Sequence, residues 1–213
     1  MDICILIPAR LNSSRFPGKM LADLDGLPLI RRVYDRCAEV YPTHVLTDSE
    51  EIANVVPDAI MTGEHDSGTD RCMAVIPKLP HKRFILCQGD MPDITPDILH
   101  ALSYKLHRSA IATCYTKAPA SVKCIHNGAQ AQWFTRAPIS YGDSHIGVYG
   151  FQRCAADVWR RLKPHEPEQF EKLEQLRWLS NGIAMDVVPV DYQGVEINWP
   201  HEVTEWLLKS GAV

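Results

Sequence analysis

The alternation of short apolar segments with longer amphipathic ones constrains the fold of this chain more than any other feature. In the first half, strands are predicted at residues 3–8, 44–47, 59–61, 83–87 and 110–116, and helices at residues 27–40, 49–56, 68–79 and 96–107. This order is typical of βαβ units around a mainly parallel sheet. Ligands of such sheets bind at the carboxyl ends of the strands, so we expect the functional site at that edge.

The second half of the chain is less regular. A hairpin is predicted from residues 122–127 and 129–135, strands at 145–152 and 183–190, and helices at 154–162, 168–179 and 200–210. The sequence contains no internal repeat, low-complexity segment or long Gly/Ser linker. We therefore expect one domain over residues 1–213, with a β excursion at about residues 117–151.

Composition excludes several classes of protein. The chain has 213 residues, of which 46% are hydrophobic, and its 22 basic and 26 acidic residues give a net charge of −4, which argues against a nucleic-acid partner. No apolar window approaches the roughly 20 residues that span a bilayer, and the N-terminus lacks the order of a signal peptide. The seven cysteines form no CxxC pair and several lie in apolar runs, which predicts buried thiols in a reducing compartment. These features indicate a cytoplasmic protein without a membrane partner.

The loop after the first predicted strand concentrates positive charge. Residues 7–21 read "IPARLNSSRFPGKML", with the cations Arg10, Arg15 and Lys19 beside Ser13 and Gly18. The loop matches neither GxxxxGK[ST] nor GxGxxG, yet glycine lets the backbone approach a polyphosphate closely while arginine and lysine bind its oxygens. A solvated basic turn is the alternative. The position after the first strand favours the phosphate interpretation.

The same loop resembles the PAR-x-x-S-x-R-x-PGK-x-L signature of the cytidylyltransferases that activate sugar acids, in particular the 3-deoxy-D-manno-octulosonate (Kdo) cytidylyltransferase family. Five more segments resemble that family's motifs in the same order, and together they cover about residues 2–205: "DSGTDRCMAV", "CQGDMPDI", "AQWFTRAPIS", "HIGVYGFQR" and "EQFEKLEQLRWLSNG". The resemblance implies a Rossmann-like nucleotidyltransferase (glycosyltransferase-A-like) α/β fold with a mainly parallel central sheet and a small β excursion.

The resemblance implies that a sugar-acid hydroxyl attacks the α-phosphate of CTP, which releases pyrophosphate and forms a CMP-sugar. This displacement depends on charge neutralisation and in-line positioning more than on a covalent nucleophile. Catalytic roles fall to Arg10, Lys19 and Asp90. The nucleotide would be bound by Ala9, Arg10, Ser13, Arg15, Lys19, Ser67 and Gln88.

A magnesium ion is implied as the cofactor, and Asp90 at the end of a predicted strand is its first candidate ligand. Without the surrounding motif, Asp90 is equally consistent with a turn or helix-capping residue that has no metal-binding role. The family has a second aspartate in a V-D-T-P-E-D-L segment, where this chain has "INWPHEV" and hence Asn198. An ungapped alignment offers Glu196 instead, and both remain open. Met91 in place of glutamate and Trp199 in place of threonine also depart from the family's pattern.

For the sugar, the resemblance indicates Arg136, His145, Tyr149, Glu171 and Gln175. Arg136 would bind the substrate carboxylate through two hydrogen bonds. His145 is also compatible with a core histidine, and Glu171 with a solvated helix face that it shares with Glu168 and Glu174. Arg177 does not share the face of Glu171 and Gln175, and a structural role suits it.

The implied partners are CTP, a sugar acid and a second copy of the chain in a homodimer. The chain is shorter than typical family members in the β excursion, so a nonulosonic acid or an amino-substituted Kdo remains an alternative acceptor. A second hypothesis, motivated by Asn198 and Met91, is a nucleotide- or sugar-binding protein whose catalysis has decayed. The resemblance places the product in the synthesis of lipopolysaccharide or another surface glycan.

Overall fold

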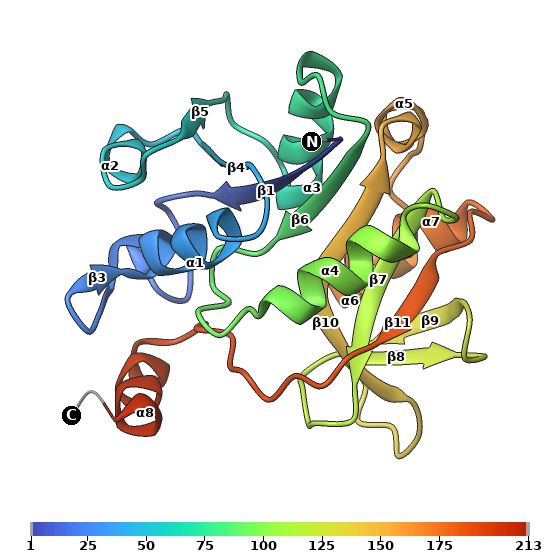
Figure 1. The fold of residues 1–213 in the computed structure, drawn as a ribbon. Coiled ribbons are helices and arrows are strands. Elements are labelled where there is room, and N and C mark those ends of the chain that lie inside the picture. Colours follow the sequence, from blue (N-terminus) through green and yellow to red (C-terminus); the bar gives the residue numbers. More distant parts are fainter. Residues whose placement is uncertain (1, 212–213) are drawn as a thin grey trace.

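The computed structural model describes residues 2–211 and has a central sheet between two layers of helices (Figure 1). The sheet runs in the order β11 (Asp186–Pro189), β7 (Ile111–Thr116), β10 (Asp143–Gln152), β6 (Arg83–Cys87), β1 (Ile3–Ala9), β4 (Thr43–Thr47) and β5 (Ala59–Met61). β1 is parallel to β4 and β6, β4 to β5, and β11 to β7, whereas β10 is antiparallel to β6 and β7. The predicted α/β fold with a mainly parallel sheet is confirmed.

The two faces of the sheet bury two separate cores, because alternate side chains of a strand point to opposite faces. The helices are α1 (Leu29–Ala38), α2 (Glu50–Ala53), α3 (Gly68–Val75), α4 (Pro96–Lys105), α5 (Cys154–Trp159), α6 (Glu166–Glu171), α7 (Leu176–Ser180) and α8 (Pro200–Ser210). In β1, Ile3, Ile5 and Ile7 pack with α1, α4 and α8, whereas Cys4 and Leu6 pack with α3, α5 and α7. Burial on both faces explains why β1 is apolar throughout.

The β excursion is a hairpin at one end of the sheet. β8 (Lys123–His126) pairs antiparallel with β9 (Ala131–Thr135), which confirms the predicted hairpin, and β8 also pairs with the start of β10. β10 itself lies inside the central sheet, although the expected excursion of residues 117–151 includes most of it. A two-stranded ribbon of β2 (Asp23–Leu24) and β3 (Leu27–Pro28) precedes α1.

The predicted helix over residues 168–179 is wrong, because the chain breaks it into α6 and α7. Lys172 adopts the left-handed conformation (φ 56°, ψ 45°), which ends α6. Glu171 and Gln175 therefore do not occupy one helical face. Glu168 is 8% exposed, so the expected solvated stripe of glutamates does not exist either.

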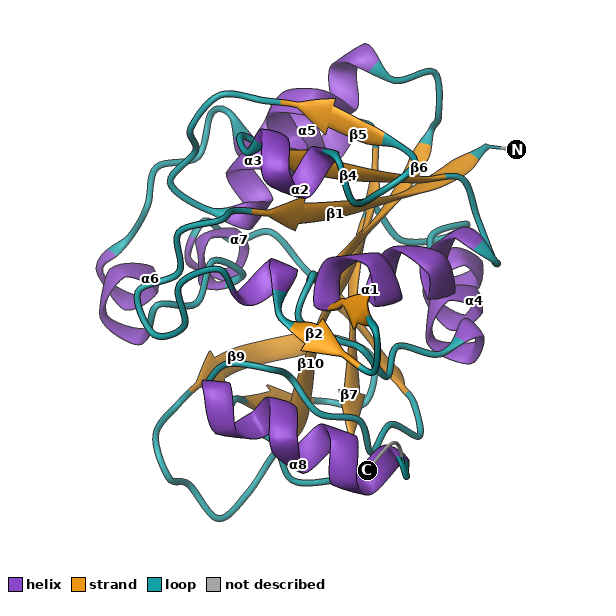
Figure 2. Ribbon diagram, turned by 90° about the vertical axis from the view of Figure 1, so that its left-hand side faces the viewer, coloured by secondary structure: helices purple, strands orange, loops and turns teal. Residues whose placement is uncertain are grey.

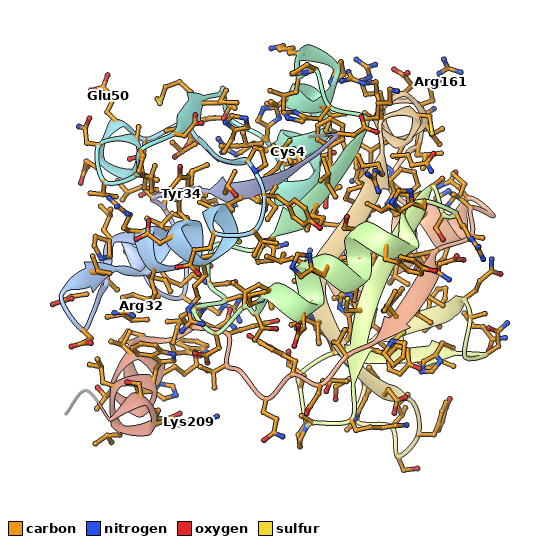
Figure 3. The ribbon with its side chains drawn as sticks, viewed as in Figure 1. Cys4, Arg32, Tyr34, Glu50, Arg161 and Lys209 are labelled. Carbon is orange, nitrogen blue, oxygen red and sulfur yellow. The ribbon has the colours of Figure 1, made fainter. Side chains whose placement is uncertain are left out.

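The C-terminal helix α8 packs beside β2, and its Trp206 contacts Arg32 of α1 (Figure 2). Arg32 on α1, labelled in Figure 3, places its guanidinium 4.9 Å from the centre of the Trp206 ring, and the Trp206 indole donates a hydrogen bond to Asp93 at 2.8 Å. Just before α8, the backbone N–H of Ile197 donates to the carbonyl of Asp90 at 2.9 Å. These contacts hold residues 195–198 at the carboxyl edge of the sheet.

All seven cysteines are free thiols, and six of them are buried as expected. Cys154 is exposed, which corrects the expectation for that residue. No helix in residues 2–211 has both the length and the apolar character needed to cross a membrane.

Candidate active site

The opening loop carries a lysine inward to the end of the neighbouring strand. Gly18 has φ +73°, a left-handed conformation that favours glycine, and it begins a short 3-10 helix over Lys19–Leu21. Lys19 is only 6% exposed, and its Nζ lies 2.6 Å from Oδ2 of Asp90, three residues after the end of β6. Because β1 and β6 are adjacent and parallel, the segments after their carboxyl ends meet at this edge.

A cavity of about 220 Å³ opens above this ion pair. It brings together all the residues predicted to bind the nucleotide and the metal: Ala9, Arg10, Ser13, Arg15, Lys19, Ser67, Gln88, Asp90 and Asn198. The three cations of the opening loop thus line the same space as the candidate metal ligands. Such a lining suits a polyphosphate with a divalent cation.

The N-terminus of α3 forms one wall of the cavity. The Ser67 hydroxyl accepts a hydrogen bond from the backbone N–H of Asp70 at 3.0 Å and donates one to its carboxylate at 2.7 Å. Gly68 packs so closely that a Cβ there would lie 3.0 Å from Cγ of Pro8 and 3.7 Å from Oε1 of Gln88. Any side chain at position 68 would therefore push this wall away from the end of β1.

The candidate metal ligands lie where residues 195–198 approach Asp90. Arg15 donates to Oδ1 of Asn198 at 2.9 Å. Burial, followed by the charge of Asp90, raises the pKa of Glu196 to about 7, while Lys19 opposes this shift. Two carboxylates in a partly buried site favour additional positive charge, and carboxylate and amide oxygens are ligand types that a hard divalent cation prefers.

Among residues 2–211, no group of three or more His, Cys, Asp or Glu side chains is arranged to hold a metal ion by itself. The donor set therefore suits a cation that is completed by phosphate oxygens, as Mg²⁺ often is. Met91 is fully buried in the core and does not line the cavity. The presence of methionine instead of the family's glutamate at position 91 therefore leaves the oxygen ligands of the cavity wall unchanged.

Two of the predicted sugar-binding residues are held together at the end of β9. The carboxylate of Glu171 accepts hydrogen bonds from the Thr135 hydroxyl at 2.6 Å and from the backbone N–H of Arg136 at 2.8 Å. The side chain of Arg136 donates in return to the Glu171 carbonyl at 3.1 Å. Glu171 is thus committed to holding the segment that carries Arg136.

His145 lies on β10 with its ring buried. Its Nε2 is 2.9 Å from the Thr113 hydroxyl, and its ring centre is 5.4 Å from that of Tyr149. Burial, assisted by the charge of Arg136, lowers the pKa of His145 to about 3, so its imidazole is neutral at ordinary pH. His145 also lines a second cavity of about 470 Å³, which Glu196 and Asn198 share.

The remaining predicted sugar residues are not part of the walls of the two cavities, although the charge of Arg136 acts on the pKa of both His145 and Glu196. Arg136, Tyr149, Glu171 and Gln175 line neither of them. Gln175 is 4% exposed, and its side-chain nitrogen has no hydrogen-bond partner within residues 2–211. Burial raises the pKa of Tyr149 well above its usual value, so its hydroxyl stays protonated.

Sequence reasoning missed three charged residues that line the 220 Å³ cavity, called the nucleotide cavity below: Asp66, Arg71 and Glu174. Arg71 is 3% exposed and pairs with Asp48 at 2.8 Å, and Glu174 accepts a hydrogen bond from the backbone N–H of Thr69 at 2.9 Å. All three belong to segments that carry the family resemblance, "DSGTDRCMAV" and "EQFEKLEQLRWLSNG". Their position within these motifs could have identified them as candidates. Helical periodicity did not show which side chains of the motifs face the cavity.

Comparison with known proteins agrees with this geometry. The cytidylyltransferase family model matches residues 4–187. The 3-deoxy-manno-octulosonate cytidylyltransferase of Bartonella bacilliformis is 36% identical over 93% of this chain and 94% of its own length. The protein of that name from Escherichia coli is 34% identical, over 92% of this chain and 91% of its own.

Solved structures extend the comparison. A CMP:2-keto-3-deoxy-manno-octonic acid synthetase complexed with CTP superposes with a TM-score of 0.91 at 31% identity, and the match covers both chains fully. The inositol-1-phosphate CTP transferase from T. maritima, at 12% identity and a TM-score of 0.73, shares the fold. This chain therefore belongs to the cytidylyltransferase family of nucleotidyltransferases, among the 3-deoxy-manno-octulosonate cytidylyltransferases.

Proposed function

We propose that this enzyme transfers CMP from CTP to Kdo or a close 2-keto-3-deoxy sugar acid and releases pyrophosphate. The observation that carries the proposal is the buried pair of Lys19 and Asp90, 2.6 Å apart, on the wall of a cation-lined cavity. The pair combines a phosphate-binding cation with a metal-binding carboxylate at the edge where α/β sheets bind ligands.

The nucleotide would lie along the opening loop. Arg10, Arg15 and Lys19 would bind the triphosphate oxygens and stabilise the charge that develops on the α-phosphate during displacement. The other proposed nucleotide contacts are Ala9, Ser13, Ser67 and Gln88. Lys19 is preorganised for this role because Asp90 already fixes its ammonium group.

Transfer from a nucleoside triphosphate calls for a divalent cation, which we propose is Mg²⁺. Asp90 and Asn198 would hold it, with Glu196 as the alternative to Asn198. When bound, the ion would neutralise phosphate charge as the pyrophosphate leaves. The contact between Arg15 and Asn198 supports placing the triphosphate and the ion side by side.

The sugar acid would lie on the side of β9 and β10. Arg136, held by Glu171, would bind its carboxylate, while Tyr149, Gln175 and a neutral His145 would bind its hydroxyls. The unpaired amide nitrogen of Gln175 supports a role in binding a polar group. These contacts would orient the attacking hydroxyl in line with the α-phosphate.

Three further expectations stand as proposals. A homodimer is supported by large apolar side chains left in solvent near the excursion, Phe170 at 86% and Trp133 at 36% exposure. A cytoplasmic location is supported by the seven free thiols. The product would serve lipopolysaccharide or a related surface glycan.

Labelled CTP tests the proposed reaction. With CTP labelled at the α-phosphate, Mg²⁺ and Kdo, we expect the label in a CMP-sugar and unlabelled pyrophosphate in equal amount, and no product with Asp90→Asn. Binding of CTP without transfer to any sugar acid would instead support the decayed binding protein suggested by Asn198.

A further inference from the structure

Two charged residues from the family-like segments meet behind the nucleotide cavity without lining it. Asp70 belongs to α3 and Arg177 to α7, and Nη1 of Arg177 lies 3.2 Å from Oδ1 of Asp70. Arg177 is 8% exposed. Because neither residue lines the cavity, either one can affect a bound ligand only through the residues that it contacts.

Every side of the Arg177 guanidinium is occupied. Its Nε and Nη2 donate to the two carboxylate oxygens of Glu168 at 2.9 and 2.5 Å, and its Cζ lies over the Trp159 ring, 4.0 Å from the ring centre. Its third nitrogen, Nη1, donates a hydrogen bond to Oδ1 of Asp70. The planar guanidinium binds one carboxylate through two donors, stacks on an indole and reaches a second carboxylate. The single ammonium group of lysine cannot make all three contacts.

On one side, Asp70 connects this arginine to the nucleotide wall. Its Oδ1 also accepts from the Trp159 indole at 2.6 Å, and its Oδ2 accepts from the Ser67 hydroxyl at 2.7 Å. Ser67 and Gly68 line the cavity, with Gly68 packed against Pro8. The position of Asp70 therefore sets the position of that wall.

On the other side, Glu168 connects the arginine to the acceptor region. Glu168 and Glu171 both belong to α6, and Glu171 holds Thr135 and the backbone of Arg136. A shift of α6 would move the Glu171 carboxylate and with it Arg136.

We propose that Arg177 is a positioning residue that sets the nucleotide wall through Asp70 and the acceptor-binding segment through Glu168. This inference rests on the proposed function. Burial of an ion pair adds little net stability, because desolvation offsets the attraction, so we infer that this pair serves to select one arrangement of the elements that it joins. Arg177 joins α3, α6 and α7 in this way.

The test compares Arg177→Lys, Asp70→Asn and a matched control, Arg153→Lys. Arg153 is partly buried and also contacts the chain through its guanidinium, with the Ile76 carbonyl at 3.1 Å and the Phe84 ring at 5.7 Å, but it does not line the nucleotide cavity. The measurements are the Kd for CTP by calorimetry, the KM for the sugar acid, kcat and the melting temperature.

Because a displaced wall weakens binding far from the substituted residue, we expect Arg177→Lys to raise the Kd for CTP and the KM for the sugar acid about tenfold each. Asp70→Asn should raise the Kd for CTP by about the same factor and leave the KM for the sugar acid within about twofold, since it acts on one wall only. Arg153→Lys should lower the melting temperature and leave both constants within about twofold.

The inference would be overturned if Arg177→Lys left both the Kd for CTP and the KM for the sugar acid unchanged. It would also be overturned if, in all three variants, both constants rose in proportion to the loss of melting temperature. A wild-type enzyme that binds CTP but turns over no sugar acid would refute the proposed reaction and the acceptor half of the inference. The Kd values for CTP would still decide the nucleotide half. A wild-type protein that binds no CTP would refute both.

Discussion

Replacing Lys19 by methionine separates its contribution to stability from its contribution to catalysis. Lys19 is 6% exposed, and its ammonium lies 2.6 Å from an Asp90 carboxylate that is itself 19% exposed. Lys19→Met keeps most of the unbranched side chain but removes the ammonium group and leaves that carboxylate unpaired. Removing one partner of a buried pair typically destabilises a protein by 3–5 kcal/mol, and the partial exposure of Asp90 reduces our expectation to about 3 kcal/mol.

The double variant Lys19→Met with Asp90→Asn removes both charges. A neutral pair of similar volume avoids the unpaired carboxylate, so we expect the free energy of unfolding to return to within about 1 kcal/mol of the wild type. Enzymatic activity, in contrast, should be lower in the double variant than in Lys19→Met. Loss of one donor to a developing oxyanion lowers kcat by about 100-fold or more, and the double variant also loses the metal-binding carboxylate.

Urea unfolding followed by tryptophan fluorescence measures the stability, and pyrophosphate release measures kcat on the same preparations. The expected pattern is an unstable, weakly active single variant and a stable, inactive double variant. A double variant as unstable as the single one would refute the account of the ion pair. Activity of Lys19→Met within tenfold of the wild type would refute the phosphate-binding role.

Three further predictions concern the acceptor side and the metal. Glu171→Gln should raise the KM for the sugar acid about tenfold and leave the Kd for CTP unchanged, because it loosens only the Arg136 segment; equal effects on both ligands would contradict this. The folded-state pKa of His145, about 3, lies below its unfolded value near 6.5, so the unfolded state alone binds this proton as pH falls from 6.5. Between pH 7 and pH 5, the wild type should therefore lose about 2 kcal/mol more unfolding free energy than His145→Gln in urea titrations, and equal losses would show that His145 protonates in the folded state. Asn198→Asp adds a charged oxygen ligand, so the metal concentration for half-maximal activity should fall about tenfold, and no change would favour Glu196 as the second ligand.

The edge of the sheet that carries the proposed nucleotide site was predictable from the sequence because a parallel sheet brings the ends of its strands to one side. The opening loop follows β1, and Asp90 comes shortly after β6. Once a parallel sheet is inferred, both are expected at its carboxyl edge. The contact between Lys19 and Asp90 also requires β1 and β6 to be neighbours, which the sequence did not predict and the structure shows.

The acceptor side was less predictable because it depends on a backbone conformation that periodicity does not encode. Residues 168–179 have a helical pattern, yet Lys172 is left-handed and splits the segment. Glu168 then turns inward to Arg177, and Glu171 turns to Arg136. Contacts with distant segments accompany this break, and local propensity does not anticipate them.

A matrix of pyrophosphate-release assays is the decisive test of the proposed CMP transfer. The purified protein is combined with Mg²⁺, with CTP, UTP, ATP or GTP, and with Kdo, 8-amino-Kdo or N-acetylneuraminate. The account predicts release with CTP and a 2-keto-3-deoxy octulosonic acid, and none with the other nucleotides. Release with UTP and not CTP, or no release from any pair by a protein that binds CTP, would contradict it.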